Sequence, residues 1–187
     1  MFLRKTSTPP YEAATPEMCV VRAQGEAPSL RRRMAAFLYE GVLLFGVVMA
    51  VALVFGIAVG QRHAMTHREG LQMWLFLAFA VYFIWFWTHG GQTLAMKTWH
   101  LRMVNKDGGA VGLPQALARF LASWVWFMPS LAGAWLAGWH QSKLLYGALI
   151  GWVIIYALAS LLHPKRLFWH DALCGTRLIE NRANPTP

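Results

Sequence analysis

Charged side chains border and interrupt a long apolar stretch near the start of the chain. Glu40 is the one charged residue between Met34 and Gly60, and Arg33 lies directly before this stretch, seven residues ahead of Glu40. In a helix this separation places both side chains on one face, two turns or about 10 Å apart. A carboxylate inside a membrane-spanning helix is costly, which makes Glu40 a candidate group for binding an ion or a proton, with Arg33 as its counter-charge.

Three further residues could complete this cluster. Asp171 follows the last apolar segment, Arg119 lies near the start of the third, and His170 could orient or tune the Asp171 carboxylate. Buried arginine–carboxylate clusters are tolerated when their hydrogen bonds are complete. The cluster is therefore either an ion- or proton-binding site, or a structural cluster that holds the C-terminal segment to the first and third apolar segments.

Other chemistry finds little support in the sequence. His63 and His67 have the i, i+4 spacing of two helical metal ligands, but Glu69 is the one further candidate ligand nearby and the HExxH pattern is absent, so both remain weak metal candidates. No Gly-x-Ser-x-Gly elbow, phosphate loop or CxxCH haem motif occurs. We therefore expect no enzyme activity, no bound metal and no cofactor.

Four apolar segments must position the charged residues. The chain is 57% hydrophobic and 13% charged, and about 20 apolar helical residues cross a hydrocarbon core about 30 Å thick. We predict an all-α membrane protein, a four-transmembrane-helix bundle in the lipid bilayer. Its spans are residues 34–59, 71–88, 115–138 and 144–163.

The third of these spans allows two interpretations. Pro129 lies within it, and proline removes a backbone donor and kinks a helix. We predict a kinked span that an interfacial turn precedes. In the alternative, residues 113–124 form an amphipathic helix on the membrane surface and leave a short, tilted span.

The distribution of basic residues predicts the topology. The formal net charge is +9, but the positive residues flank the apolar segments and do not form one amphipathic face, so no nucleic-acid partner is expected. The positive-inside rule places both termini and the middle loop in the cytoplasm, as in a multi-pass protein of the cell inner membrane. The residues that decide this are Arg31, Arg32, Arg33, Lys97, Arg102, Lys106, Lys165, Arg166, Arg177 and Arg182.

The segments outside the spans are short. Residues 1–29 contain four prolines and no apolar run, and we predict that they form a disordered cytoplasmic tail, as residues 181–187 also do. Apolar and polar residues alternate over 99–104, and residues 105–109 have the composition of a turn. With a return over 110–112, they predict a short cytoplasmic β-hairpin between spans two and three, which rests on the bilayer or on the C-terminal segment.

Three motifs in this order resemble the RDD family of prokaryotic membrane proteins, which is named for one arginine and two aspartates. They run from Arg33 to Glu40, from Gly91 to Gly108 and from His170 to Thr176. The resemblance covers residues 30–179 and implies a transmembrane domain over 30–180. Glu40 stands where the family usually has aspartate, one methylene shorter, and Ala95 and His100 stand where glycine is common.

The resemblance implies two classes of function. Some members of the family have been proposed to exchange cations for protons, which fits a small ion- or proton-coupled transporter or transport component. The alternative is a non-transporting membrane scaffold or assembly partner that docks through the small residues Gly133, Ala134, Ala137 and Gly138 and through the hairpin. Four spans are few for a monomeric carrier, so we expect a homo-oligomer or another membrane protein as partner.

Overall fold

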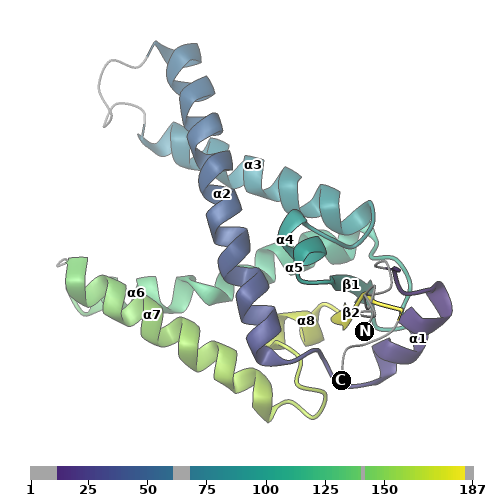
Figure 1. Cartoon of the computed structure of the whole chain (residues 1–187). Coiled ribbons are helices and arrows are strands. Elements are labelled where there is room, and N and C mark those ends of the chain that lie inside the picture. The colour runs from purple at the N-terminus through teal and green to yellow at the C-terminus, as the bar shows by residue number, and fades with distance from the viewer. Residues whose placement is uncertain (1–11, 61–67, 140–141, 184–187) are drawn as a thin grey trace, which may run out of the picture.

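Three long helices carry the apolar segments (Figure 1). The computed structural model describes residues 12–60, 68–139 and 142–183, and the weak metal candidates His63 and His67 lie outside these residues. The helices long and apolar enough to cross a membrane are α2 (Leu30–Val59), α3 (Arg68–Thr88) and α7 (Ser142–Ala159), which a 3₁₀ turn extends over Ser160–Leu162. These helices match the predicted first, second and fourth spans.

The predicted third span is divided into separate pieces, so a count of four spans is not confirmed. It consists of α5 (Leu113–Ser123), a 3₁₀ turn over Trp124–Trp126 and α6 (Met128–Leu136). The nine residues of α6 rise about 14 Å, which is less than half of a hydrocarbon core about 30 Å thick. Pro129 is the second residue of α6, where proline is tolerated, so it begins a helix and does not kink one.

The amphipathic alternative describes α5 better than the kinked span does. Ala116, Arg119 and Phe120 form its buried face, which packs against α3 and α8 (Trp169–Leu173). Its opposite face exposes a row of leucines with a spacing of four residues. They are Leu113, Leu117 and Leu121. A helix with one face against protein and one exposed apolar face is suited to the membrane surface.

A two-stranded antiparallel sheet joins the middle of the chain to its C-terminal part. β1 (Leu101–Asn105) pairs with β2 (Thr176–Glu180), and Met103 lies opposite Leu178. Residues 105–109 form the predicted turn, but residues 110–112 do not return as a strand, because Val111 packs into the core. A small two-stranded antiparallel sheet that contains the first predicted strand is therefore confirmed. The predicted return strand over residues 110–112 was wrong, because β2 is the partner of β1.

The prediction of a disordered N-terminal tail was wrong for α1 (Pro16–Gln24). Thr15 accepts a hydrogen bond from the Met18 N–H and so caps the helix. Cys19 and Ala23 pack with Val104 and Ile179 against one face of the sheet. Residues 181–183, the described part of the tail after β2, are also fixed to the rest of the chain, since the Asn181 N–H donates to the His100 carbonyl.

The main core lies on the other face of the sheet. Leu101, Met103 and Leu178 belong to it, together with aromatic residues of α3, α5 and the 3₁₀ turn. From this end of the molecule, α2 and α3 extend as one pair and α6 and α7 as a second pair in a different direction (Figure 1). α4 (Leu94–Thr98) links α3 to β1 and packs against α2. The predicted charged residues lie at this shared end.

Candidate functional site

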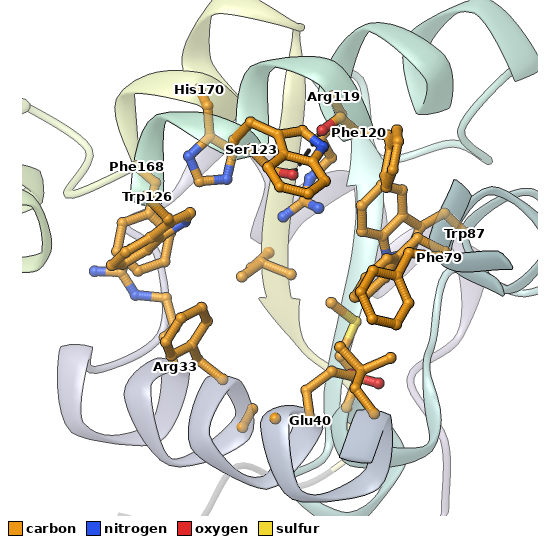
Figure 2. A pocket seen from close by; sticks show the side chains of 18 of the residues that line it. Arg33, Glu40, Phe79, Trp87, Arg119, Phe120, Ser123, Trp126, Phe168 and His170 are labelled. Atoms are coloured by element: carbon orange, nitrogen blue, oxygen red, sulfur yellow. Dashed lines mark hydrogen bonds between the residues drawn. The ribbon is translucent and has the colours of Figure 1, made fainter. Parts of the chain in front are cut away.

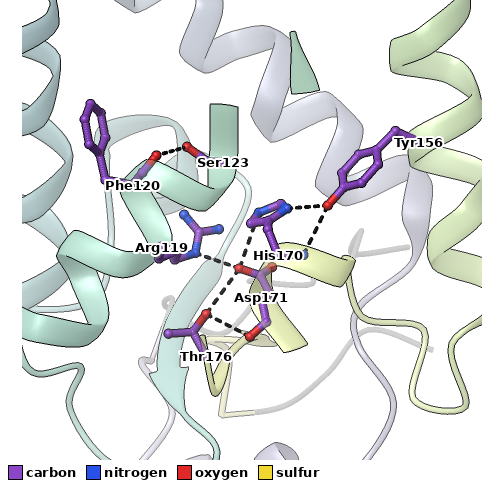
Figure 3. Close-up of polar contacts among 7 residues, drawn as sticks. All are labelled: Arg119, Phe120, Ser123, Tyr156, His170, Asp171 and Thr176. Atoms are coloured by element: carbon purple, nitrogen blue, oxygen red, sulfur yellow. Dashed lines mark hydrogen bonds and ion pairs between the residues drawn. The ribbon is translucent and has the colours of Figure 1, made fainter. Parts of the chain in front are cut away.

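A buried ion pair connects α5 to α8. The Arg119 Nε donates to Asp171 Oδ1 at 2.6 Å, and the two side chains are 7% and 2% exposed. Thr176, at the start of β2, also donates from its hydroxyl to Asp171 Oδ1 at 3.3 Å (Figure 3). The Arg119 guanidinium lies 4.2 Å from the centre of the Trp87 ring. Charge, hydrogen bonds and a cation–π contact together offset the cost of burying this pair.

His170 extends the cluster toward α7. Its Nδ1 lies 2.8 Å from the Tyr156 hydroxyl, and its Nε2 lies 3.5 Å from Asp171 Oδ1 (Figure 3). Burial lowers the pKa of His170 to about 4, and the positive charges of Arg119 and Arg33 act in the same direction, against Asp171. The imidazole is therefore neutral at pH 7. We assign its proton to Nε2, facing the carboxylate, so that Nδ1 accepts from Tyr156.

Asp171 is the charged partner of this group. Burial, the largest single effect, would by itself raise the pKa of the Asp171 carboxyl, but the charge of Arg119, the interaction with His170 and the hydrogen bonds of Arg119 and Thr176 together outweigh it. The net effect holds the pKa of Asp171 below its usual range. Arg119 and Asp171 are therefore a charged pair beside a neutral histidine at pH 7.

Arg33 lies apart from this pair. Its guanidinium stacks 4.2 Å from the centre of the Phe168 ring, and Nη2 donates to the Ser160 hydroxyl at 3.3 Å. The side chain is buried, and its Nε has no hydrogen-bond partner within the described part of the chain. The neighbouring Arg32, in contrast, forms an ion pair with Glu180 of β2 at 2.7 Å.

Glu40 is held by neutral groups. Tyr82 of α3 donates its hydroxyl to Glu40 Oε1 at 2.6 Å, and the hydroxyl of Thr93 donates to Oε2. Thr93 also caps α4, accepting from the Met96 N–H at 3.2 Å. No ion pair joins Glu40 to Arg33 or to any other described residue, so the two side chains are not in direct contact, as their separation of two turns indicates, and the counter-charge role of Arg33 stays a prediction.

A cavity of about 510 Å³ connects the two groups of charged residues (Figure 2). Arg33 and Glu40 of α2 line one side of it, and Arg119 and His170 line the opposite side. Most of the remaining wall is aromatic. Asp171 does not line the cavity but pairs with Arg119. Four of the five predicted residues therefore line one cavity, and the five form one three-residue contact cluster and two separate sites.

Several residues of the site were not predicted from the sequence. Tyr82 and Thr93 supply hydroxyls to Glu40, Ser160 supplies one to Arg33, and Tyr156 supplies one to the neutral His170. Thr93 carried a local signal, because a threonine just before a helical segment is a preferred N-cap. The other three lie in apolar sequence, where the hydroxyl of a serine is commonly satisfied by its own helix and a tyrosine gives no sign of the partner that its hydroxyl will find.

Long apolar helices that meet at a buried charged site define this chain as a multi-pass membrane protein. The RDD family model matches residues 27–175. The chain therefore belongs to the RDD family, as the three sequence motifs predicted. No curated protein and no solved structure matches it.

Proposed function

We propose that this protein is a small proton- or ion-coupled transporter, or a component of one, in which Glu40 is the acid that takes up and releases the coupling ion. One observation carries the proposal. Glu40 is a buried carboxylate in a membrane helix, it has no basic partner among the described residues, and it lines a cavity. Intramembrane acids of this kind are functional candidates by default.

The partners of Glu40 support this assignment. Tyr82 and Thr93 donate hydrogen bonds but carry no compensating charge. A bare carboxylate in such surroundings is costly, whereas a proton or a bound cation removes the cost. Glu40 is therefore suited to take up a proton or a cation, as a coupled carrier requires. Asp171 lacks this property, because Arg119 already neutralises it at 2.6 Å.

We assign the Arg119–Asp171–His170 cluster to structure. It joins α5 to α8, and α8 leads directly into β2. The cluster therefore fixes the floor of the cavity on which the Glu40 site depends. Our proposal includes no catalytic step.

The arrangement of the helices supports the predicted topology. α2 and α3 form one pair and α6 and α7 another, and both pairs extend from the end that holds α1 and the sheet (Figure 1). A chain that leaves and returns twice has both termini on one side. We propose that this side is the cytoplasm and that the membrane is the cell inner membrane, because the basic residues cluster there.

We further propose that the protein works as a homo-oligomer. In the most apolar stretches of α2 and α3, only 6% of the residues are buried by the rest of the chain, and in α7 17% are. These helices therefore leave most of their surface to lipid or to other helices. A second copy would supply the additional spans that a carrier usually needs.

Proton flux in proteoliposomes tests the proposal. Wild type and Glu40→Gln are compared under an imposed proton gradient with Na⁺, K⁺ or Li⁺ present. Glutamine keeps the shape of the side chain but neither ionises nor exchanges a proton, so cation-dependent proton movement should disappear. Glu69→Gln is the matched control, since Glu69 is an exposed carboxylate at the opposite end of α3 and should keep the flux.

Asp171→Asn separates the two acids. If Asp171 is structural, this variant reduces the yield of folded protein, but the fraction that folds keeps its flux. Flux that survives in folded Glu40→Gln protein contradicts the assignment of Glu40. No flux in wild type with any of the three cations contradicts transport itself.

A docking role is the second candidate, and the surroundings of Gly133 favour it. A Cβ atom on Gly133 would meet nothing within 4 Å, so this part of α6 presents an open surface. Gly138 has a different explanation, because its φ of +67° ends α6 in a left-handed turn. Docking predicts that Gly133→Leu abolishes assembly with a partner and that Glu40→Gln does not.

A further inference from the structure

The cavity between α2 and α5 has the walls of a site for an apolar molecule. Its volume is about 510 Å³, within the range of about 300–1,000 Å³ typical of small-molecule sites. Aromatic rings from α2, α3, α5 and the 3₁₀ turn form much of its surface (Figure 2). They are Phe37, Phe79, Phe83, Trp87, Phe120 and Trp126.

The unsatisfied polar groups of this cavity are of one kind. The Arg33 Nε and the Trp87 Nε1 are both buried and have no hydrogen-bond partner in the part of the chain that the structure describes. Both side chains line the cavity. Both atoms are donors, and a buried donor without an acceptor costs about 1–3 kcal/mol. A molecule that fills the cavity would therefore need to supply acceptor oxygens.

The charges around the cavity indicate that a molecule bound there should be negatively charged. Asp171 neutralises Arg119, and both carboxylate oxygens of Glu40 already accept hydrogen bonds. Arg33 is 3% exposed and has a ring and a hydroxyl as neighbours, and none of the described carboxylates lies within ion-pair distance of it. The charge of Asp171 acts on Arg33 only from farther away, and Asp171 already pairs with Arg119. A buried guanidinium without an anion is costly, and oxyanions are its best partners. The missing partner is thus an anion.

The edge of the cavity indicates how such a molecule enters. Leu38 lines the cavity and is also 65% exposed on the outer side of α2. Val42 and Phe45 continue this exposed apolar surface along the helix. The opening therefore faces the hydrocarbon and not water, and a ligand would arrive from the bilayer.

We propose that this cavity binds a single-chain lipophilic anion, with its acid group at Arg33 and its hydrocarbon chain among the aromatic rings. The acid is a carboxylate, as in a long-chain fatty acid, or a phosphate, as in a single-chain lipid. This binding site goes beyond the proposed coupling function, and Arg33 becomes the anchor of a ligand and not the counter-charge of Glu40.

Equilibrium binding to the purified full-length protein tests the site. Radiolabelled palmitate is the probe, and unlabelled hexadecyl phosphate and hexadecanol compete with it. Palmitate should bind at one saturable site per chain, and the uncharged alcohol should compete at least about tenfold more weakly than either anion. Whichever anion binds more tightly identifies the carboxylate or the phosphate as the natural acid.

Two variants assign the site to the cavity. Arg33→Gln should weaken palmitate binding by at least about tenfold, whereas Arg32→Gln, the neighbour that pairs with Glu180, should not. If Arg33→Gln does not fold, Ala36→Phe provides the test, because Ala36 lines the cavity and a ring there would occupy the space of the ligand.

The proposal is wrong if hexadecanol competes as well as palmitate, if no saturable binding occurs, or if both cavity variants bind like wild type. Binding is measured without a gradient, so these results leave the transport proposal untouched. Conversely, if the protein binds palmitate but moves no protons, the proposed binding site is supported and the proposed transport function is contradicted.

Discussion

Arg119 and Asp171 lie 52 residues apart in the sequence and meet at 2.6 Å between α5 and α8. Their side chains are nearly inaccessible, and Thr176 and Trp87 complete the surroundings of the pair. Because α8 continues into β2, this contact also fixes where the sheet lies. A second ion pair, Arg166 with Glu26 at 3.4 Å, is more than half exposed and serves as its natural comparison.

Asp171→Asn should therefore cost far more stability than Glu26→Gln. The first variant leaves the Arg119 charge buried and uncompensated, and breaking a buried pair in this way costs about 3–5 kcal/mol. The exposed pair contributes little, so Glu26→Gln should leave unfolding unchanged. Thermal unfolding of the detergent-solubilised protein measures both. Equal effects of the two variants would contradict a structural role for Asp171.

Replacing both partners gives a second test of the same pair. Arg119→Met with Asp171→Leu removes both charges, and buried pairs replaced by apolar residues are often neutral or more stable. The double variant should unfold at a higher temperature than Asp171→Asn alone. If it also keeps proton flux, the pair is a structural connection and not part of the ion path.

Stability should fall as the pH is lowered from 6.5 to 4 because of His170. Its pKa is about 4 in the folded protein against 6.5 for an ordinary histidine. The unfolded chain therefore binds a proton in this window while the folded chain does not, so the stability present above pH 6.5 is lost as the pH falls. The loss from this group is at most about 3 kcal/mol.

Melting temperatures at pH 7 and pH 5 measure the effect of His170. The decrease should be smaller in His170→Gln, which cannot bind a proton at this position. His89→Gln, at an exposed histidine near the end of α3, should show the same decrease as wild type. If His170→Gln matches wild type as well, the acid sensitivity comes from elsewhere in the chain.

The long helices were predictable because each depends on its own sequence. An apolar run such as Met34 to Gly60 leaves no other structure available in a membrane. That Asp171 would meet an arginine was also expected, because a buried charge needs an opposite one, but the sequence left open whether Arg119 or one of Arg31–Arg33 would be the partner. These local rules describe the three long helices, but not the division of the predicted third span into α5 and α6.

The rest depends on partners that are distant in sequence. β1 pairs with β2, more than 70 residues away, and nothing near residues 110–112 signals that a better partner exists. α1 has only nine residues, too few for a stable isolated helix, and it is stabilised because the completed sheet offers a surface to Cys19 and Ala23. Glu40 accepts hydrogen bonds from the hydroxyls of Tyr82 in α3 and Thr93 before α4, and not from Arg33, because α3 and α4 pack beside α2.

Gly91→Ala should destabilise the junction between α3 and β1. Gly91 has a φ of +72°, and an added Cβ would lie 2.3 Å from the Met103 carbonyl oxygen. The backbone conformation alone costs an alanine about 1–2 kcal/mol, and the clash adds to it. Gly46→Ala is the control, because Gly46 lies inside α2 with open space around it and should keep or slightly raise the melting temperature. A normal melting temperature for Gly91→Ala would contradict the close approach of this turn to β1.

Thiol labelling should show whether α1 is docked in solution. Cys19 is 2% exposed because it lies on the face of α1 that packs on the sheet, whereas Cys174 is half-buried. In a Cys174→Ser background, maleimide should therefore modify Cys19 more slowly than it modifies Cys174 in a Cys19→Ser background. An unstructured N-terminal tail would instead make Cys19 the faster thiol.

Adding Arg22→Ala to the Cys174→Ser background should release that protection. Arg22 donates to the Glu180 carbonyl at 2.7 Å and to the Ala183 carbonyl at 3.4 Å, and so ties α1 to the end of β2. Hydrogen bonds from a charged group contribute about 1.5–3 kcal/mol, so α1 should undock more often and Cys19 should react about tenfold faster or more. Glu17→Gln changes an exposed residue of the same helix and should leave the labelling rate unchanged. Because labelling reports the undocked population directly, an unchanged rate in Arg22→Ala would mean that the other contacts of α1, among them the packing of Cys19 and Ala23 and the hydrogen bond from Arg177 to the Ala23 carbonyl, are enough to hold it on the sheet.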